Sequence, residues 1–315
     1  MTEYKGTFLS SDGKTELTYA LTEPDVPVRG IVQIIHGMAE HISRYSDYAA
    51  HLASLGFVCA GEDHLGHGES CFDDEKLGFF ARTDGWRMLI ADAHSLTLIL
   101  KEKYPNVPVF LLGHSMGSFI ARLYLSEYAE ELTGAVIMGT AGPGAPTGAA
   151  VAMINTISLF KGEMHRSKFI DKLAFGSYNK KIEPKRTKFD WLTKDDAIVD
   201  KYIADDKCGF LFTLSGYRDL MTLIRECNAS TWPETVPTDL PVLIISGDCD
   251  PVGNYGEGPK KVAGMLAAAG SIGVTLRLCK GDRHEILNET DREEVYSIID
   301  EWIASVMPKA EETEE

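Results

Sequence analysis

Six short aliphatic runs, separated by helix-length segments, constrain the fold of this chain more than any other feature. The runs are Gly30 to Ile35, Phe57 to Gly61, Val107 to Leu112, Ala135 to Gly139, Val242 to Ser246 and Val274 to Cys279. Each is almost continuously apolar, which is typical of a parallel strand covered by helices on both faces. Amphipathic stretches such as 45–55 and 86–100 lie between them. This alternation predicts strand–helix–strand units and a parallel sheet.

Two further strand-like segments open the chain, at 4–10 and 16–22, with the turn residues Ser11, Asp12 and Gly13 between them. They predict an antiparallel hairpin. Together with the six runs they give a mostly parallel eight-stranded sheet flanked by helices, a fold of the α/β class. An apolar stripe over 295–306 predicts a final helix, and Thr290 and Glu293 have the spacing of a capping box at its start.

The alternation is broken between residues 143 and 233. This stretch begins in the segment AGPGAPTGAA, continues in an apolar run that ends at Phe160, and then becomes rich in lysine and in aromatic residues. We expect a helical cap above the strand ends, where ligands bind in open α/β sheets. The predicted division is a core of residues 1–142 and 234–315 and a cap of residues 143–233. The apolar run could line an acyl channel, but its helical period favours packing within the cap.

Composition and charge exclude several classes of protein. Apolar residues make up 44% and charged residues 25% of the chain, as in folded globular proteins. The net charge of −16 disfavours nucleic acid and anionic membrane surfaces as partners. The longest apolar run, 149–154, is far shorter than the ~18 residues that cross a bilayer, so no stable membrane insertion is expected. The first residues, MTEYKG, lack the layout of a secretory signal, which predicts a cytoplasmic protein if the chain is the full precursor. No pattern specifies the oligomeric state.

The pentapeptide Gly113-His114-Ser115-Met116-Gly117 follows the run ending at Leu112 and precedes a helical segment. A serine in such a strand–turn–helix arrangement has a strained backbone, and the flanking glycines remove side chains that would collide. The turn exposes the hydroxyl above the sheet and places the Met116 amide at a helix N-terminus, where an oxyanion is stabilised. Ser115 is therefore the predicted nucleophile. A tight turn that merely contains a serine is the alternative.

A serine hydroxyl needs a base, and a histidine needs an acid that orients it. His284 follows the last aliphatic run and is the predicted general base. Asp248 and Asp250 both follow the run that ends at Ser246. Asp250 is favoured because the proline after it biases it toward an extended conformation, whereas Asp248 could bond to amides of the turn.

A second oxyanion amide should come from the turn after an earlier strand. Met38, which follows the run ending at Ile35, fits this place beside Met116. No cofactor and no metal are expected. The six cysteines occur singly, without a CxxC pair, and the two histidines of DHLGHGES stand next to glycines typical of turns.

The segments HGMAEHISRY, DHLGHGES, GHSMG, GDCDPVG and DRHEILNE, in this order, resemble the monoacylglycerol lipase and lysophospholipase-like branch of the α/β-hydrolase superfamily. That branch overlaps the group labelled serine aminopeptidases. The resemblance covers residues 27–141 and 240–305 and implies an α/β-hydrolase fold with a helical cap. It also implies that Glu40 and Arg44 contact a glycerol-like alcohol, and we place His114 with them as a candidate substrate-binding residue. A structural ion pair is the alternative for Glu40 and Arg44.

These observations predict a serine carboxylic ester hydrolase that forms an acyl-enzyme on a small-molecule ester or lipid. A monoacylglycerol or related neutral lipid is favoured, because the acidic surface disfavours anionic substrates. The alternatives are a lysophospholipase, an aminopeptidase-like amide hydrolase and a catalytically inactive binding protein. An aminopeptidase would need a carboxylate for the substrate ammonium group, and Glu163, Asp190 or Asp195 in the cap could supply it.

Overall fold

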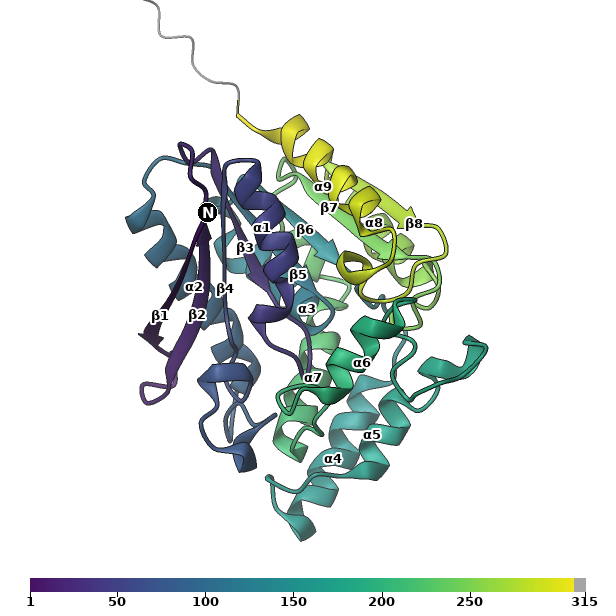
Figure 1. The fold of residues 1–315 in the computed structure, drawn as a ribbon. Helices are drawn as coiled ribbons and strands as arrows, with labels where there is room; N and C mark the ends of the chain where they lie inside the picture. The colour runs from purple at the N-terminus through teal and green to yellow at the C-terminus, as the bar shows by residue number, and fades with distance from the viewer. Residues whose placement is uncertain (309–315) are drawn as a thin grey trace, which may run out of the picture.

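The predicted mostly parallel eight-stranded sheet is confirmed by the computed structural model, which describes residues 1–308 (Figure 1). The strands are β1 (Thr2–Leu9), β2 (Glu16–Glu23), β3 (Gly30–Ile35), β4 (Phe57–Glu62), β5 (Val109–His114), β6 (Gly134–Met138), β7 (Val242–Gly247) and β8 (Val274–Cys279). Their order in the sheet is β1-β2-β4-β3-β5-β6-β7-β8. Strand β2 is antiparallel to both neighbours, and all other neighbouring pairs are parallel.

The opening hairpin forms because its turn satisfies its own backbone. One carboxylate oxygen of Asp12 accepts hydrogen bonds from the amides of Lys14 and Thr15, both at 2.7 Å. The hairpin then extends the sheet, because β2 also pairs with β4 through Tyr19 to Thr22.

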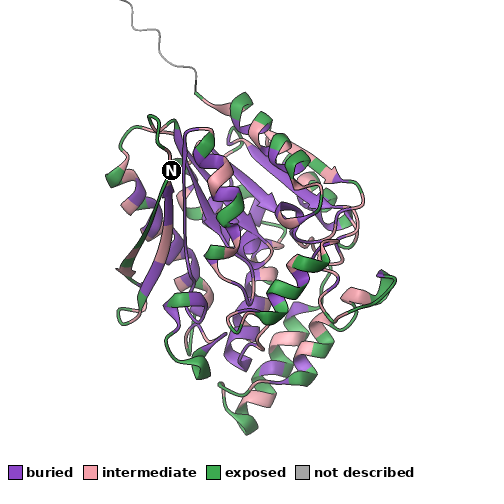
Figure 2. Cartoon of the chain, viewed as in Figure 1, coloured by how far each residue is buried: buried purple, intermediate pink, exposed green. Residues whose placement is uncertain are grey.

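Helices cover both faces of the sheet, as the aliphatic strands require. They are α1 (Ser46–Ser54), α2 (Gly85–Lys103), α3 (Met116–Tyr128), α8 (Glu257–Ala268) and α9 (Arg292–Val306). The side chains of β5 alternate between the two faces. Leu111 packs in the core cluster under α2, α3 and α8, whereas Phe110 and Leu112 pack in the cluster under α1 and α9. Figure 2 shows the central strands as a buried band between these layers.

The stretch between β6 and β7 is largely helical, as expected. It contains α4 (Thr147–Lys161), α5 (Lys168–Phe175), α6 (Asp196–Ala204) and α7 (Leu214–Cys227). Figure 1 shows these helices gathered at one end of the sheet. We call residues 143–233 the cap segment; its status as a separate domain stays a prediction. Short 3-10 helices complete the described chain: Ile42–Tyr45, Gly68–Ser70, Asp74–Lys76, Ala129–Glu131, Tyr178–Lys181, Trp232–Thr235 and Ile286–Asn288.

The predicted capping box at the start of the last helix is wrong. Helix α9 begins at Arg292, and no side chain caps its N-terminus. The Asp291 carboxylate, which precedes the helix, instead lies 3.2 Å from the ammonium group of Lys194 in the cap segment. A tertiary ion pair has therefore taken the place of the local cap. None of the helices in residues 1–308 has the length and apolar character needed to cross a bilayer.

Candidate active site

Ser115 lies in the sharp turn between β5 and α3, with φ of 54° and ψ of −118°. Few residues other than glycine adopt such a positive φ. The glycines around it are required by close approach. A Cβ atom on Gly113 would lie 2.3 Å from the Gly117 carbonyl oxygen, and one on Gly117 would lie 2.0 Å from the Ile35 carbonyl oxygen. Strand β5, helix α3 and strand β3 thus meet directly beneath the serine.

His284 and Asp250 are joined in the buried interior near this turn. The imidazole Nδ1 lies 2.9 Å from a carboxylate oxygen of Asp250, and both side chains are almost fully buried. Because an ionised carboxylate can only accept, Nδ1 donates and Nε2 keeps its lone pair. The Val252 amide donates to the other Asp250 oxygen at 2.8 Å and holds it in place. Asp248 does not reach the imidazole and accepts the Gly281 amide at 2.7 Å instead.

Ser115 and His284 line the same cavity. The imidazole lies over the end of β6, since a Cβ atom on Gly139 would come within 3.1 Å of its Cε1 atom. Strand β6 is the neighbour of β5, whose end carries Ser115. Within residues 1–308 no hydrogen bond joins the Ser115 hydroxyl to the imidazole; such bonds are often longer in a site without substrate and shorten when it binds.

The two predicted oxyanion amides are available. Met38 lies in the turn after β3. This turn packs on the nucleophile, because a Cβ atom on Gly37 would lie 3.1 Å from Cβ of Ser115. In this turn the Gly37 amide donates to Glu40 at 2.5 Å and the Ala39 amide donates to a histidine ring. The Met38 amide has no hydrogen bond among the described residues, and the Met116 amide, first in α3, has no partner in its helix.

Three buried histidines support the Met38 turn. His36 Nδ1 donates to the Gly37 carbonyl at 2.8 Å, and His64 Nε2 donates to the His36 carbonyl at 3.2 Å. His67 Nε2 accepts the Ala39 amide at 3.2 Å. Burial and the neighbouring imidazoles lower the pKa of His36 well below its usual value, and burial lowers the pKa of His67 to about 3. Both rings are therefore neutral, and their hydrogen bonds fix the backbone of the turn.

A buried charge network lies on the other side of this turn. The Arg44 guanidinium donates to Glu40 at 2.5 Å and to both oxygens of Glu285 at 2.8 and 2.6 Å. Burial alone would raise the pKa of the Glu40 carboxyl, but the His114 hydrogen bond and the Arg44 charge hold it well below its usual range. Burial likewise opposes the charge of Arg44, yet the two carboxylates raise its pKa.

His114 carries a positive charge in this network. The Tyr45 hydroxyl donates its only proton to Glu40 at 2.9 Å, so His114 Nδ1, which lies 2.9 Å from the same hydroxyl, must donate to it. His114 Nε2 donates to the His284 carbonyl at 3.3 Å. Although burial would lower the pKa of His114, the Glu40 carboxylate raises it, in agreement with two protonated nitrogens.

Of the three candidate substrate-binding residues, Glu40 and His114 line the cavity and Arg44 does not. Both amino nitrogens of Arg44 are held by carboxylates, so its geometry is that of the ion-pair alternative. Contact between substrate and Glu40 or His114 stays a prediction.

The cavity has a volume of about 860 Å³, within the range of small-molecule sites. Core and cap segment both line it, and six of the cap aromatic residues face it: Phe175, Tyr178, Phe189, Trp191, Tyr202 and Phe210. The apolar run of α4 divides between roles, since Met153 and Ile154 line the cavity while Leu159 and Phe160 are exposed. The α4 run is therefore neither wholly a channel wall nor wholly a core.

The sequence profile of the family described as "Serine aminopeptidase, S33" matches residues 26–291 of this chain. The chain belongs to this family. The resemblance to α/β-hydrolases that its motifs carry is thereby confirmed.

Proteins similar to this chain include two lipases and an esterase. The monoacylglycerol lipase of Mycolicibacterium smegmatis is 27% identical over 93% of this chain and 94% of that protein. Human monoglyceride lipase is 32% identical over 37% of this chain and 36% of that protein. A solved carboxyl esterase from Bacillus coagulans, in complex with glycerol, is 32% identical with a TM-score of 0.90, over 97% of this chain and 99% of that chain.

Sequence reasoning missed the contact that Trp191 makes with the loop after β8, residues 280–285, which carries His284 and which we call the base loop. Its carbonyl accepts the His284 amide at 3.4 Å, and its ring centroid lies 5.1 Å from that of the imidazole. The Glu285 amide donates to the Leu192 carbonyl at 2.7 Å, and Arg283 donates to the Thr193 carbonyl at 2.9 Å. We call residues 190–194 the cap strip. Only the abundance of aromatic residues in the cap segment signalled such a contact.

The three cap carboxylates considered for an aminopeptidase lie elsewhere. Asp190 accepts the amides of Arg186 and Thr187, Asp195 caps the N-terminus of α6, and Glu163 pairs with Arg218. None of the three is among the described residues that line the cavity.

Proposed function

We propose that this chain is a serine carboxylic ester hydrolase that cleaves monoacylglycerols or related neutral lipid esters through an acyl-enzyme intermediate. One observation carries the proposal: the strained Ser115 shares a cavity with His284, whose ring is oriented by Asp250 at 2.9 Å. The relatives named as monoacylglycerol lipases and the glycerol-bound esterase support the substrate class.

The geometry suits acyl transfer in two steps. The Ser115 oxygen attacks the ester carbonyl carbon while its proton passes to His284 Nε2. The carbonyl oxygen becomes an oxyanion that the Met38 and Met116 amides bind. When this intermediate collapses, the alcohol leaves with the proton from His284. Water then attacks the acyl-enzyme by the same route, which releases the acid and restores the serine. Asp250 stays ionised and stabilises the imidazolium.

The cavity offers both polar and apolar side chains, as a monoacylglycerol requires. Glu40 lies on its wall, and its carboxylate oxygens can accept hydrogen bonds from hydroxyl groups of an alcohol, whereas both ring nitrogens of His114 are already bonded within the protein. Met153, Ile154 and Phe210 supply apolar wall for an acyl chain.

A lysophospholipase is a second candidate, because Lys188 and Lys261 also line the cavity and could pair with a phosphate. A chain-length series of monoacylglycerols, run beside lysophosphatidylcholine and aminoacyl anilides, distinguishes the substrate classes. We expect monoacylglycerols to have the highest kcat/KM. Turnover of the anilides alone would contradict an ester substrate.

The role of Ser115 is tested by labelling with a fluorophosphonate probe and by ester hydrolysis. We expect Ser115→Ala to abolish labelling and to lower kcat by about 10⁴-fold or more. Ser126→Ala is the matched control, since Ser126 lies on α3 with its hydroxyl bonded to Thr235 away from the cavity. Folded wild-type protein that takes no label would instead indicate a binding protein.

We also propose a reducing compartment, the cytoplasm, as the place of action. All six cysteines are unpaired, and structural disulfides are typical of oxidising compartments.

A further inference from the structure

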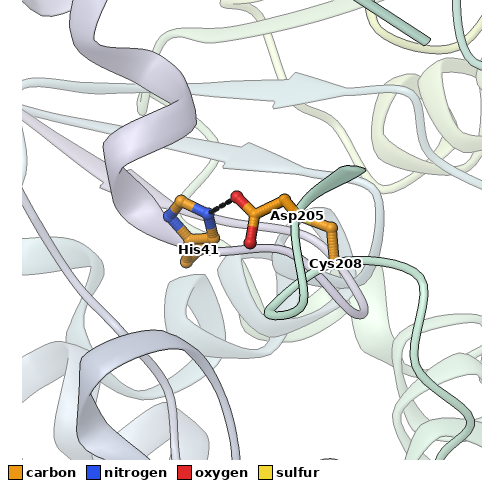
Figure 3. A group of neighbouring side chains, drawn as sticks. All are labelled: His41, Asp205 and Cys208. Atoms are coloured by element: carbon orange, nitrogen blue, oxygen red, sulfur yellow. Dashed lines mark hydrogen bonds and ion pairs between the residues drawn. The ribbon is translucent and has the colours of Figure 1, made fainter. Parts of the chain in front are cut away.

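Three unlike metal-binding side chains meet where the Met38 turn contacts the cap segment (Figure 3). His41 follows that turn, and Asp205 and Cys208 come from the loop after α6. One ring nitrogen, one carboxylate oxygen and the sulfur all lie within 4.8 Å of one another. His41 Nε2 is 2.8 Å from Asp205 Oδ2. Ligands of a tetrahedral zinc ion lie about 3 to 4 Å apart, so small rotations would bring all three to one ion.

The Cys208 thiol belongs to a small buried cluster with Leu192 and Tyr202. It is only 9% exposed and makes no hydrogen bond among residues 1–308. Burial raises the pKa of this thiol, so it is neutral without a metal. The His41 and Asp205 side chains are 17% and 36% exposed, which opens the trio to solvent and gives an ion a path of entry.

The surrounding charge permits a cation. Arg44 and Lys207 are neighbouring cationic side chains, but Glu40 and Glu285 both pair with Arg44, and Asp74 pairs with Lys207. The charges of Arg44 and the protonated His114 balance those of Glu40 and Glu285, so Asp205 supplies the negative charge of the site itself.

We propose that His41, Asp205 and Cys208 bind a zinc ion. Nitrogen, oxygen and thiolate sulfur are the donors that zinc prefers, and three protein ligands leave a fourth position for water. On binding, the thiol releases its proton to solvent and the His41 ring proton moves from Nε2 to Nδ1 by exchange with solvent. Nε2, the Asp205 carboxylate and the thiolate then form bonds to the ion in place of the hydrogen bond between His41 and Asp205. The site goes beyond the proposed function, because it uses no group of the hydrolytic chemistry.

Two other clusters show what distinguishes this trio. Asp282, Glu289 and Asp291 also converge, but Lys194 already lies 2.6 Å from Asp282 and 3.2 Å from Asp291 and supplies the positive charge. His51 and Asp300 form a similar pair at 2.7 Å, without a cysteine in the group. His51 is therefore a matched control for His41.

A zinc ion here would join the Met38 turn to the cap segment. The Gly209 amide and the Tyr202 hydroxyl already bond to the Ala39 carbonyl, at 2.9 and 3.0 Å. The ion would add bonds from His41 on one side of this contact and from Asp205 and Cys208 on the other, so we expect zinc to raise the Tm of the wild type.

The test is titration of the full chain with Cd²⁺, whose bond to a thiolate gives an ultraviolet charge-transfer band, followed by calorimetry with Zn²⁺. We expect one ion per chain in the wild type. Cys208→Ser should lose the band, and His41→Ala should weaken binding by more than about tenfold. His51→Ala and Cys249→Ser should bind as the wild type does.

The proposal would be overturned if the wild type did not bind the metal, or if Cys208→Ser and His41→Ala bound it as tightly as the wild type does. Fluorophosphonate labelling and the metal-free Tm report whether each variant is folded. If Cys208→Ser does not fold, Asp205→Asn on the more exposed side of the site takes its place, with the same tenfold weakening expected. Because the readout is metal binding, failure here leaves the hydrolase proposal untouched.

Discussion

Two aspartates that flank a single residue have different partners at the end of β7. Asp250 bonds to His284, while Asp248 bonds to the Gly281 amide and closes the turn between β7 and the base loop. The sequence favours Asp250 because of the proline after it, and the geometry agrees with that preference. The catalytic role of either residue is a matter for kinetics.

We expect Asp250→Asn to lower kcat by about 10⁴-fold, because an amide would favour the wrong imidazole tautomer. Asp248→Asn is the matched control. The oxygen of its side-chain amide can still accept the Gly281 amide, so kcat should stay within a few-fold of wild type. Steady-state ester hydrolysis measures both, and a larger effect at Asp248 would reverse the assignment.

Single residues are predictable from sequence where their geometry is local. The strained turn at Ser115 is encoded in five consecutive residues, and the structure has it as expected. The pairing of Arg44 with Glu40 was one of the alternatives read from the sequence, but its second partner, Glu285, was not predictable, since it lies 241 residues away. His41 and Cys208 illustrate the same limit, because rules based on short ligand spacing miss donors that only the fold brings together.

Among the elements, α7 of the cap segment and α2 of the core meet at an unusual contact. Asp219 of α7 is buried against the start of α2, where a Cβ atom on Gly85 would lie 2.4 Å from its Oδ2 atom. Burial raises the pKa of Asp219 to about 7. The groups around it act in both directions: Arg218 and the Trp86 amide lower the pKa, whereas Asp84 and Glu163 raise it.

This contact predicts a pH-dependent stability. Unfolded Asp219 releases its proton near pH 3.8 and the folded residue near pH 7. Between these two pH values the folded state binds one proton more than the unfolded state. The stability that comes from this proton on Asp219 is lost as the pH rises through this window. We expect Asp219→Asn to remove up to about 1.4 kcal/mol per pH unit from the slope of the unfolding free energy.

Urea unfolding of wild type and Asp219→Asn at pH 5, 6, 7 and 8 measures this slope. The exposed Asp239→Asn, which is not among the groups that act on Asp219, should keep the wild-type slope. Parallel curves for wild type and Asp219→Asn would show that the carboxyl does not titrate in this range.

Elements were predicted well where one local signal dominates. The aliphatic runs place the six parallel strands to within about two residues, because continuous burial demands such runs in β3 to β7, whereas the edge strand β8 is only partly buried. The capping box failed, since the choice between capping α9 and pairing with Lys194 is made by the tertiary structure. For the same reason the sequence could not say which cap aromatic residues face the cavity.

For the whole molecule, charge is the property that sets substrate preference at a distance. The net charge of −16 repels anionic esters, whereas Lys188 and Lys261 attract them once they reach the cavity.

Salt separates the two effects. Screening of long-range repulsion should raise kcat/KM for an anionic lysophospholipid about threefold or more as NaCl increases from low to physiological concentration. The value for a monoacylglycerol with the same acyl chain should hardly change. Stopped assays of product release across a salt series measure both. A fall with salt for the anionic ester would mean that the cavity lysines dominate.

The hydrogen bonds between the cap strip and the base loop also limit which part of the cap segment can move without disturbing the site. Because the His284 amide donates to the Trp191 carbonyl, moving the cap strip away from the sheet would displace His284 and would separate its imidazole from Ser115. If the cap segment opened at this contact to admit an ester, the histidine would be displaced at each opening. Helices α4 and α5 lie farther from the sheet (Figure 1), and within residues 1–308 no hydrogen bond joins them to the base loop, so displacing them would leave the imidazole in place.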